Sequence, residues 1–171
     1  VWHSDTAYKP CPDMGTVLYA MEVPDAGGDT LYANTYLAYE TLSDGMKKLL
    51  DGLIGVNDSE ALYPGGRANR IGALAEMKGA YNDGAEPMQS EHPVVRTHPE
   101  TGRKSLYVNA AHTIRFKDMT VAESQPLIQF LSAHAVRPEF TCRLKWRAGT
   151  LAVWDNRCTQ HARKDFPGHE R

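Results

Sequence analysis

Trp2-His3-Ser4-Asp5 lies at the start of the chain, and a second histidine, His161, lies near its end. His3 and Asp5 are two residues apart, so an extended strand would direct both side chains to the same face. We therefore predict that residues 1–8 form a strand. For the three side chains to act together, the fold must bring residue 161 back to residues 3 and 5.

Two imidazoles and one carboxylate form a known ligand set for Fe(II), and this set leaves coordination positions open for small molecules. His3, Asp5 and His161 are therefore candidate metal ligands and catalytic residues. The His-X-Asp spacing by itself also fits a surface histidine beside a turn carboxylate. The choice between these two interpretations depends on the rest of the sequence.

The composition is that of a soluble globular domain. The 171 residues are 42% hydrophobic and carry a formal net charge of −2, which gives no electrostatic attraction to nucleic acid. The sequence has no run of about 18 apolar residues, so we predict no membrane partner. We expect a small molecule as the partner, and the sequence is compatible with a homo-oligomer.

The three cysteines are Cys11, Cys142 and Cys158, an odd number without the CxxC spacing. This pattern argues against a disulfide framework and against a structural zinc site. We therefore predict free thiols and a cytoplasmic location, since the cytoplasm is reducing.

Hydrophobic periodicity and turn residues predict short strands toward both ends of the chain, with helices between them. A capping box from Thr120 to Glu123 predicts the start of a helix. Two further helices are expected at residues 38–42 and after Ser43. The apolar side of the helix that follows Thr120 is expected to carry Leu127, Ile128, Phe130 and Leu131. The expected strands cover residues 16–23, 30–33, 54–56, 93–97, 105–108, 141–146 and 150–154.

These elements indicate a mainly β fold with flanking helices around a double-stranded β-helix core, the jelly roll of cupin-like proteins. Such a core needs about eight strands, and fewer are recognisable here. We therefore expect a single domain over residues 1–171 that lacks flanking segments at both ends. Residues 59–91 show no clean period, and loops of this length are usually functional or mobile. We predict a lid there, with a disordered insertion as the alternative.

Four motifs follow one another along the sequence. They are His3-Ser4-Asp5, then Gly27-Gly28-Asp29-Thr30, then the stretch from His92 to Pro99, and finally Trp154-Asp155-Asn156-Arg157 followed by His161. Together they resemble the TauD/TfdA family of Fe(II)- and 2-oxoglutarate-dependent dioxygenases. The resemblance extends over essentially all 171 residues.

The resemblance implies roles for individual residues. His3, Asp5 and His161 match the iron ligands. Thr30 matches the threonine that hydrogen-bonds the remote carboxylate of 2-oxoglutarate. Arg171 lies where the family places an arginine that pairs with the same carboxylate, and the forked guanidinium suits a bidentate contact.

The resemblance also implies substrate contacts. Thr6 and Tyr8 match positions in the pocket wall. His112 stands where the sulfonate-using members have an aromatic residue, and the Leu62-Tyr63 region does not match their substrate-binding pair. We therefore expect a substrate other than taurine.

Three residues around these motifs carry structural expectations. His98 lies in a hairpin turn and is expected at the surface. Asp155 and Arg157 are expected to pair and to fix the segment that carries His161.

The implied reaction is hydroxylation of a small anionic organic compound, with release of succinate and CO2. The substrate would be a sulfonate, a sulfate ester, or an aryloxy or alkyl carboxylate, and the cofactors Fe(II), O2 and the cosubstrate 2-oxoglutarate. One alternative is a catalytically silent cupin-like domain that binds a small molecule. Another is a metal-dependent isomerase or lyase, which would not need a keto acid; Thr30 and Arg171 argue against it.

Overall fold

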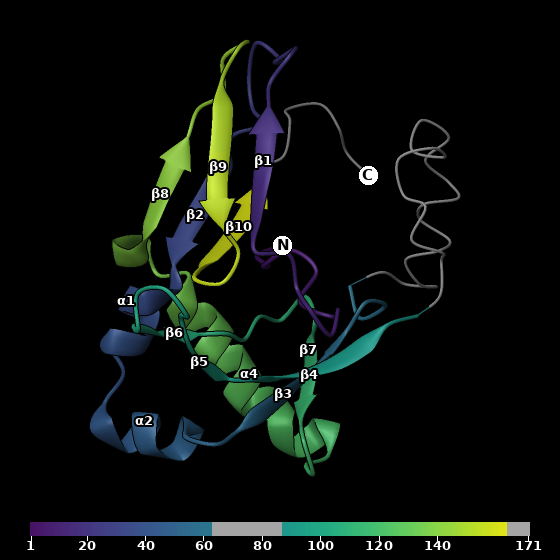
Figure 1. Cartoon of the computed structure of the whole chain (residues 1–171), viewed down its shortest axis with the longest axis vertical. Coiled ribbons are helices and arrows are strands. Elements are labelled where there is room, and N and C mark those ends of the chain that lie inside the picture. Colours follow the sequence, from purple (N-terminus) through teal and green to yellow (C-terminus); the bar gives the residue numbers. More distant parts are fainter. Residues whose placement is uncertain (63–86, 164–171) are drawn as a thin grey trace.

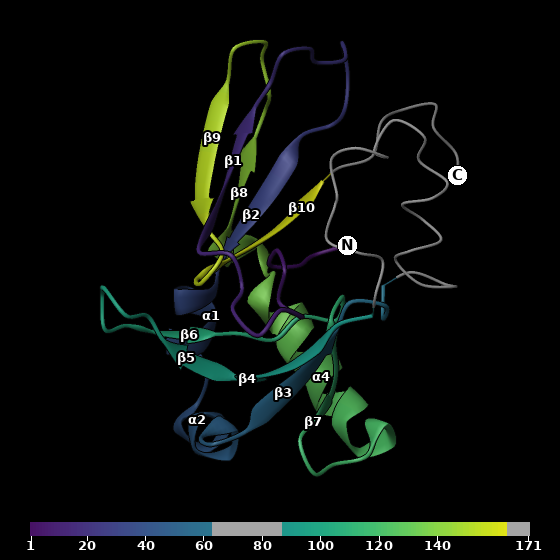
Figure 2. The ribbon, with the colours of Figure 1, turned by 45° about the vertical axis from the view of Figure 1, so that its right-hand side comes forward.

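The computed structural model describes residues 1–62 and 87–163, and in it the chain forms two halves (Figures 1 and 2). One half consists of strands, and the other combines strands with all the described helices. The first half contains β1 (Gly15–Tyr19), β2 (Thr30–Asn34), β8 (Thr141–Leu144), β9 (Leu151–Asp155) and β10 (Thr159–Arg163). The second contains β3 (Ile54–Asp58), β4 (Gln89–Pro93), β5 (Val95–Thr97), β6 (Lys104–Leu106), β7 (Thr113–Phe116), α1 (Thr35–Glu40), α2 (Asp44–Leu50), α4 (Val121–Ala135) and the 3-10 helix η2 (Pro138–Phe140).

The strand half has two antiparallel layers, with strand orders β10-β2-β8 and β1-β9. The ring of Trp154, on β9, lies 5.3 Å from the ring of Tyr32 on β2 and 4.9 Å from that of His161 on β10, between centroids. The inner faces of the two layers therefore meet around these rings. Val17 and Val153 form the pair next to Thr16 and Trp154 in the β1–β9 ladder. Both are exposed, because neighbouring residues of a strand point to opposite faces.

The hydrophobic core lies in the other half, between α4 and the strands. Thr120 and Glu123 form the expected capping box, and the helix begins at Val121. Its buried face packs into a cluster that consists of Ala38, Leu42, Leu50, Val94, Leu106, Val108, Phe116, Ile128, Leu131, Ala135 and Phe140. Phe130 was expected on the apolar side of α4, and this prediction is wrong, because its side chain is 50% exposed. In the described part of the chain, no helix is long and apolar enough to cross a membrane.

The prediction of an initial strand over residues 1–8 is wrong. Only His3 pairs with another strand, in an isolated antiparallel bridge to His161. The following residues form a turn in which Thr6 has a φ of 53°, outside the extended region. His3 and Asp5 therefore meet through a turn and not through strand alternation.

Most other elements appear near their expected positions, with shifted ends. Neither β7 nor β10 was predicted from the sequence. β7 has only four residues, and β10 is mostly polar. Residues 63–86 of the predicted 59–91 lid lie outside the described residues. The last three residues of that segment are not loop, because β4 begins at Gln89 and pairs with β3.

The packing of α4 gives a prediction for stability. Leu131 is fully buried, so Leu131→Ala should lower the free energy of unfolding by about 2–5 kcal/mol through lost contacts and a new cavity. Its neighbour Phe130 is half exposed, and Phe130→Ala should cost about 1 kcal/mol or less. Urea unfolding of both variants measures the difference. Equal losses would show that the buried face of α4 is assigned wrongly.

Candidate active site

His3, Asp5 and His161 converge on one point between the two halves. Each offers one ligand atom, and the three atoms lie within 4.8 Å of one another. Nε2 of His3 is 3.5 Å from Oδ1 of Asp5, and Nε2 of His161 is 3.7 Å from the same oxygen. Their side chains are 27%, 27% and 13% exposed, so a metal ion and small molecules can reach them.

Backbone pairing produces this convergence. The amide of His3 donates to the carbonyl of His161 at 3.0 Å, and the amide of His161 donates back at 2.8 Å. The hydroxyl of Ser4 adds a bond to the carbonyl of Thr159, also on β10, at 2.8 Å. The start of the chain is thus attached along the strand that carries the third candidate ligand.

The charges of this triad suit a divalent metal. Burial raises the pKa of Asp5, but hydrogen bonds from His3 and Thr16 and the positive charge of both histidines lower it to about 2. Burial, together with the charge of His3, lowers the pKa of His161 to about 4. At neutral pH Asp5 is therefore ionised and His161 is neutral, the states in which both groups bind metals. The three donors fit Fe(II) in type and number.

Thr30 lies on the same sheet as His161 and on the same face. Gly27 and Gly28, with φ of 82° and 74°, turn the chain into β2, a conformation that favours glycine. Across the β10–β2 ladder, Tyr32 pairs with His161, and Thr30 lies two residues further along β2. Oγ1 of the buried Thr30 accepts a hydrogen bond from the indole of Trp146 at 3.0 Å. The hydroxyl proton of Thr30 is then left to donate to another group.

The three candidate pocket residues have different positions. The ring of the buried His112 lies 6.1 Å from that of His3 and 5.2 Å from that of Tyr8. Burial and the charge of His3 lower the pKa of His112 to about 4, so it is neutral. The hydroxyl of Thr6 accepts a hydrogen bond from the amide of Asp13 in the following loop. Its contact with the pocket is therefore less direct than that of His112 or Tyr8. Arg171 lies outside the described residues.

A second group with metal-binding side chains, His98, Asp155 and Cys158, also has ligand atoms within 4.8 Å. Here the groups already have partners. Nδ1 of His98 accepts two backbone amides, so its Nε2 carries the proton and donates to Asp155 at 3.1 Å. The guanidinium of Arg157 binds the same carboxylate at 2.6 Å, and its positive charge opposes a metal cation.

His98, Asp155 and Arg157 therefore form a structural clamp. Asp155 and Arg157 pair as the sequence predicted. The surface position predicted for His98 is wrong, because His98 is 4% exposed. The clamp joins the β5–β6 turn of one half to the β9–β10 turn of the other, just before His161.

Tyr32 and Thr16 are the residues at the site that the sequence did not reveal. The ring of Tyr32 stacks at 6.2 Å on that of His161, and Thr16 donates to Asp5 at 2.6 Å. Strand alternation from Thr30 could have indicated Tyr32. The position of Thr16 depends on a turn that the sequence pattern does not predict.

Comparison with known proteins now identifies the family. The chain matches the family described as taurine catabolism dioxygenase TauD, TfdA family over residues 1–171. The chain belongs to this family. TauD/TfdA membership confirms the expected mainly β fold with its jelly-roll core. The family implies Fe(II), 2-oxoglutarate and O2 as cofactors.

Three relatives illustrate the similarity. The alpha-ketoglutarate-dependent sulfate ester dioxygenase of Pseudomonas putida is 35% identical over 168 residues, which cover 98% of this chain and 55% of the relative. The structure of a taurine dioxygenase from Burkholderia xenovorans has a TM-score of 0.78 at 36% identity, covering 96% of this chain and 50% of that one. The structure of AAD-2 in complex with Mn(II) and N-oxalylglycine has a TM-score of 0.78 at 31% identity. The match covers 97% of this chain and 57% of that one. The chain thus spans about half the length of the proteins it matches.

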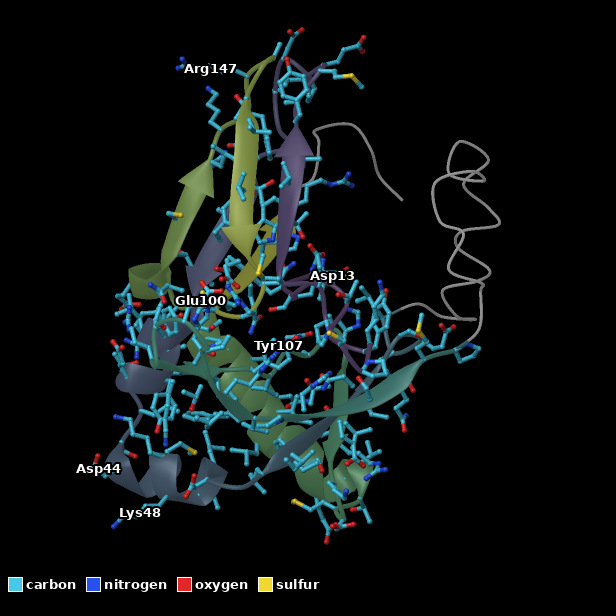
Figure 3. The ribbon with its side chains drawn as sticks, in the orientation of Figure 1. Asp13, Asp44, Lys48, Glu100, Tyr107 and Arg147 are labelled. Carbon is cyan, nitrogen blue, oxygen red and sulfur yellow. The ribbon has the colours of Figure 1, made fainter. Side chains whose placement is uncertain are left out.

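The triad gives a prediction for metal binding. Asp5→Ala should weaken Mn(II) binding by more than about 100-fold, since even partners of metal ligands contribute 10- to 100-fold. Asp13→Ala is the matched control, because Asp13 is an exposed carboxylate in the same N-terminal loop (Figure 3). The electron paramagnetic resonance signal of free Mn(II) measures the affinity. Similar Mn(II) binding by the two variants would remove Asp5 from the ligand set.

Proposed function

We propose that this TauD/TfdA protein is an Fe(II)- and 2-oxoglutarate-dependent dioxygenase that hydroxylates a small anionic organic substrate, with release of succinate and CO2. The observation that carries the proposal is the convergence of His3, Asp5 and His161 from opposite ends of the chain. A silent binding domain would have no need to keep an ionised carboxylate between two imidazoles at a reachable position.

The three proposed ligands leave coordination positions open on one side of the metal. Bound iron, O2 and 2-oxoglutarate would supply the oxidation itself: one oxygen atom of O2 enters succinate as the keto acid loses CO2, and the other enters a substrate C–H bond. The protein has to hold both molecules in place and to limit the access of water. His3, Asp5 and His161 would hold the metal, while Thr30 and Arg171 would bind the remote carboxylate of 2-oxoglutarate.

The substrate would lie on the side of His3, beside Tyr8 and His112. Both rings contact one another and His112 contacts His3, so a molecule held there lies next to the metal site. A sulfonate, a sulfate ester, or an aryloxy or alkyl carboxylate is the proposed substrate class. The activity of the Pseudomonas putida relative on sulfate esters supports an anionic group.

A cytoplasmic location is also proposed. Cys11, Cys142 and Cys158 are all free thiols, and the first two are exposed. A reducing compartment keeps exposed thiols in this state.

The direct test is succinate production by the intact protein with 2-oxoglutarate, Fe(II) and ascorbate. A panel of alkyl sulfates, alkanesulfonates and aryloxyacetates should reveal one class that raises succinate release above the level without substrate. Metal binding without succinate release under any of these conditions would contradict the proposal. That outcome would favour an isomerase, a lyase or a silent binding domain.

The role of Thr30 gives a separate prediction. Thr30→Val should weaken binding of 2-oxoglutarate to the Mn(II)-loaded protein by roughly 10- to 100-fold, because a hydrogen bond to a charged group is lost. Thr35 is also a buried threonine, at the start of α1, so Thr35→Val is the matched control. Calorimetry measures both affinities. Unchanged binding in Thr30→Val would place the cosubstrate elsewhere.

A further inference from the structure

The two carboxylate oxygens of Asp5 have different surroundings. Oδ1 faces the histidines, 3.5 Å from Nε2 of His3 and 3.7 Å from Nε2 of His161. Oδ2 accepts a short hydrogen bond, 2.6 Å, from the hydroxyl of Thr16. Oδ1 is therefore the oxygen that faces both histidines, while Oδ2 is held by Thr16.

A chain of hydrogen bonds fixes the direction of that hydroxyl. The indole N–H of Trp154 can only donate, and it donates to Oδ1 of Asn156 at 3.0 Å. The amide group of Asn156 must then present its NH2 to the other side, where Nδ2 donates to Oγ1 of Thr16 at 2.9 Å. Oγ1 of Thr16 accepts this bond, and because the ionised carboxylate of Asp5 can only accept, the single proton of the Thr16 hydroxyl is directed to Asp5.

These three residues belong to rigid structure. Thr16 and Trp154 are cross-strand partners in the β1–β9 ladder. Asn156 is 1% exposed, and its backbone amide donates to the carbonyl of Met14 at 2.9 Å. Asp5, by contrast, lies in a turn of the N-terminal segment. Through these hydrogen bonds, residues of the β1–β9 ladder fix the position of the Asp5 side chain, although Asp5 itself lies in a turn.

We propose that Thr16, oriented by Asn156, is a positioning residue that makes Asp5 a one-oxygen ligand. This inference rests on the proposed function, in which Asp5 binds the metal. By holding Oδ2, Thr16 prevents the carboxylate from rotating and from occupying a second coordination position. It also reduces the entropy that Asp5 would lose on binding, so it strengthens the metal site.

The test compares two substitutions at position 16 in the intact protein. Thr16→Val keeps the shape of the side chain but loses the hydroxyl, and it should weaken Mn(II) binding by about 10- to 100-fold. Thr16→Ser keeps the hydroxyl and should return the affinity toward that of the wild type. The exposed Thr97 on β5 gives the control Thr97→Val. Free Mn(II) is measured by electron paramagnetic resonance, and thermal unfolding without metal shows that each variant is folded.

The possible outcomes separate this inference from the proposed function. Wild-type protein that binds Mn(II) no better than Asp5→Ala would overturn both. Tight binding by the wild type and equally tight binding by Thr16→Val would overturn the positioning role alone. Equal weakening in Thr16→Val and Thr16→Ser would assign the effect to packing, and would likewise overturn it.

Discussion

Two backbone hydrogen bonds between His3 and His161 are the constraint on which the candidate active site depends. They place the first residues of the chain along β10, so that side chains separated by more than 150 positions share one point. The metal site is therefore first a consequence of backbone pairing, and the chemistry of the three side chains follows from it.

The clamp of His98, Asp155 and Arg157 supports this pairing. It joins the two halves immediately before β10, through a carboxylate that accepts from both an imidazole and a guanidinium. Hydrogen bonds to charged groups are stronger than neutral ones. Because Asp155 and Arg157 lie only a few residues from His161, the contact that joins the halves also sets where the third ligand stands.

Local signals in the sequence predicted local structure well. The capping box at Thr120 gave the start of α4, and motif order indicated that residues 3, 5 and 161 would meet. The prediction of an initial strand was wrong because the positive φ of Thr6 has no recognisable signal in the sequence. The prediction of a surface position for His98 was wrong for another reason: its partner, Asp155, is 57 positions away in the sequence. Hairpin patterns indicate where a turn lies, and they do not indicate which distant residue covers it.

The attachment of the N-terminal segment has a consequence for susceptibility to proteases. Two proposed metal ligands stand on this segment and the third on β10, so metal binding and attachment of the segment are thermodynamically linked. A ligand at 100 times its dissociation constant adds about 2.7 kcal/mol to the state that binds it. Opening of the pairing between residues 3–4 and β10 therefore becomes rarer as the metal concentration rises. Proteases would therefore cleave the loop Lys9-Pro10-Cys11-Pro12 more slowly in the metal-loaded protein, so metal binding would protect the protein from degradation.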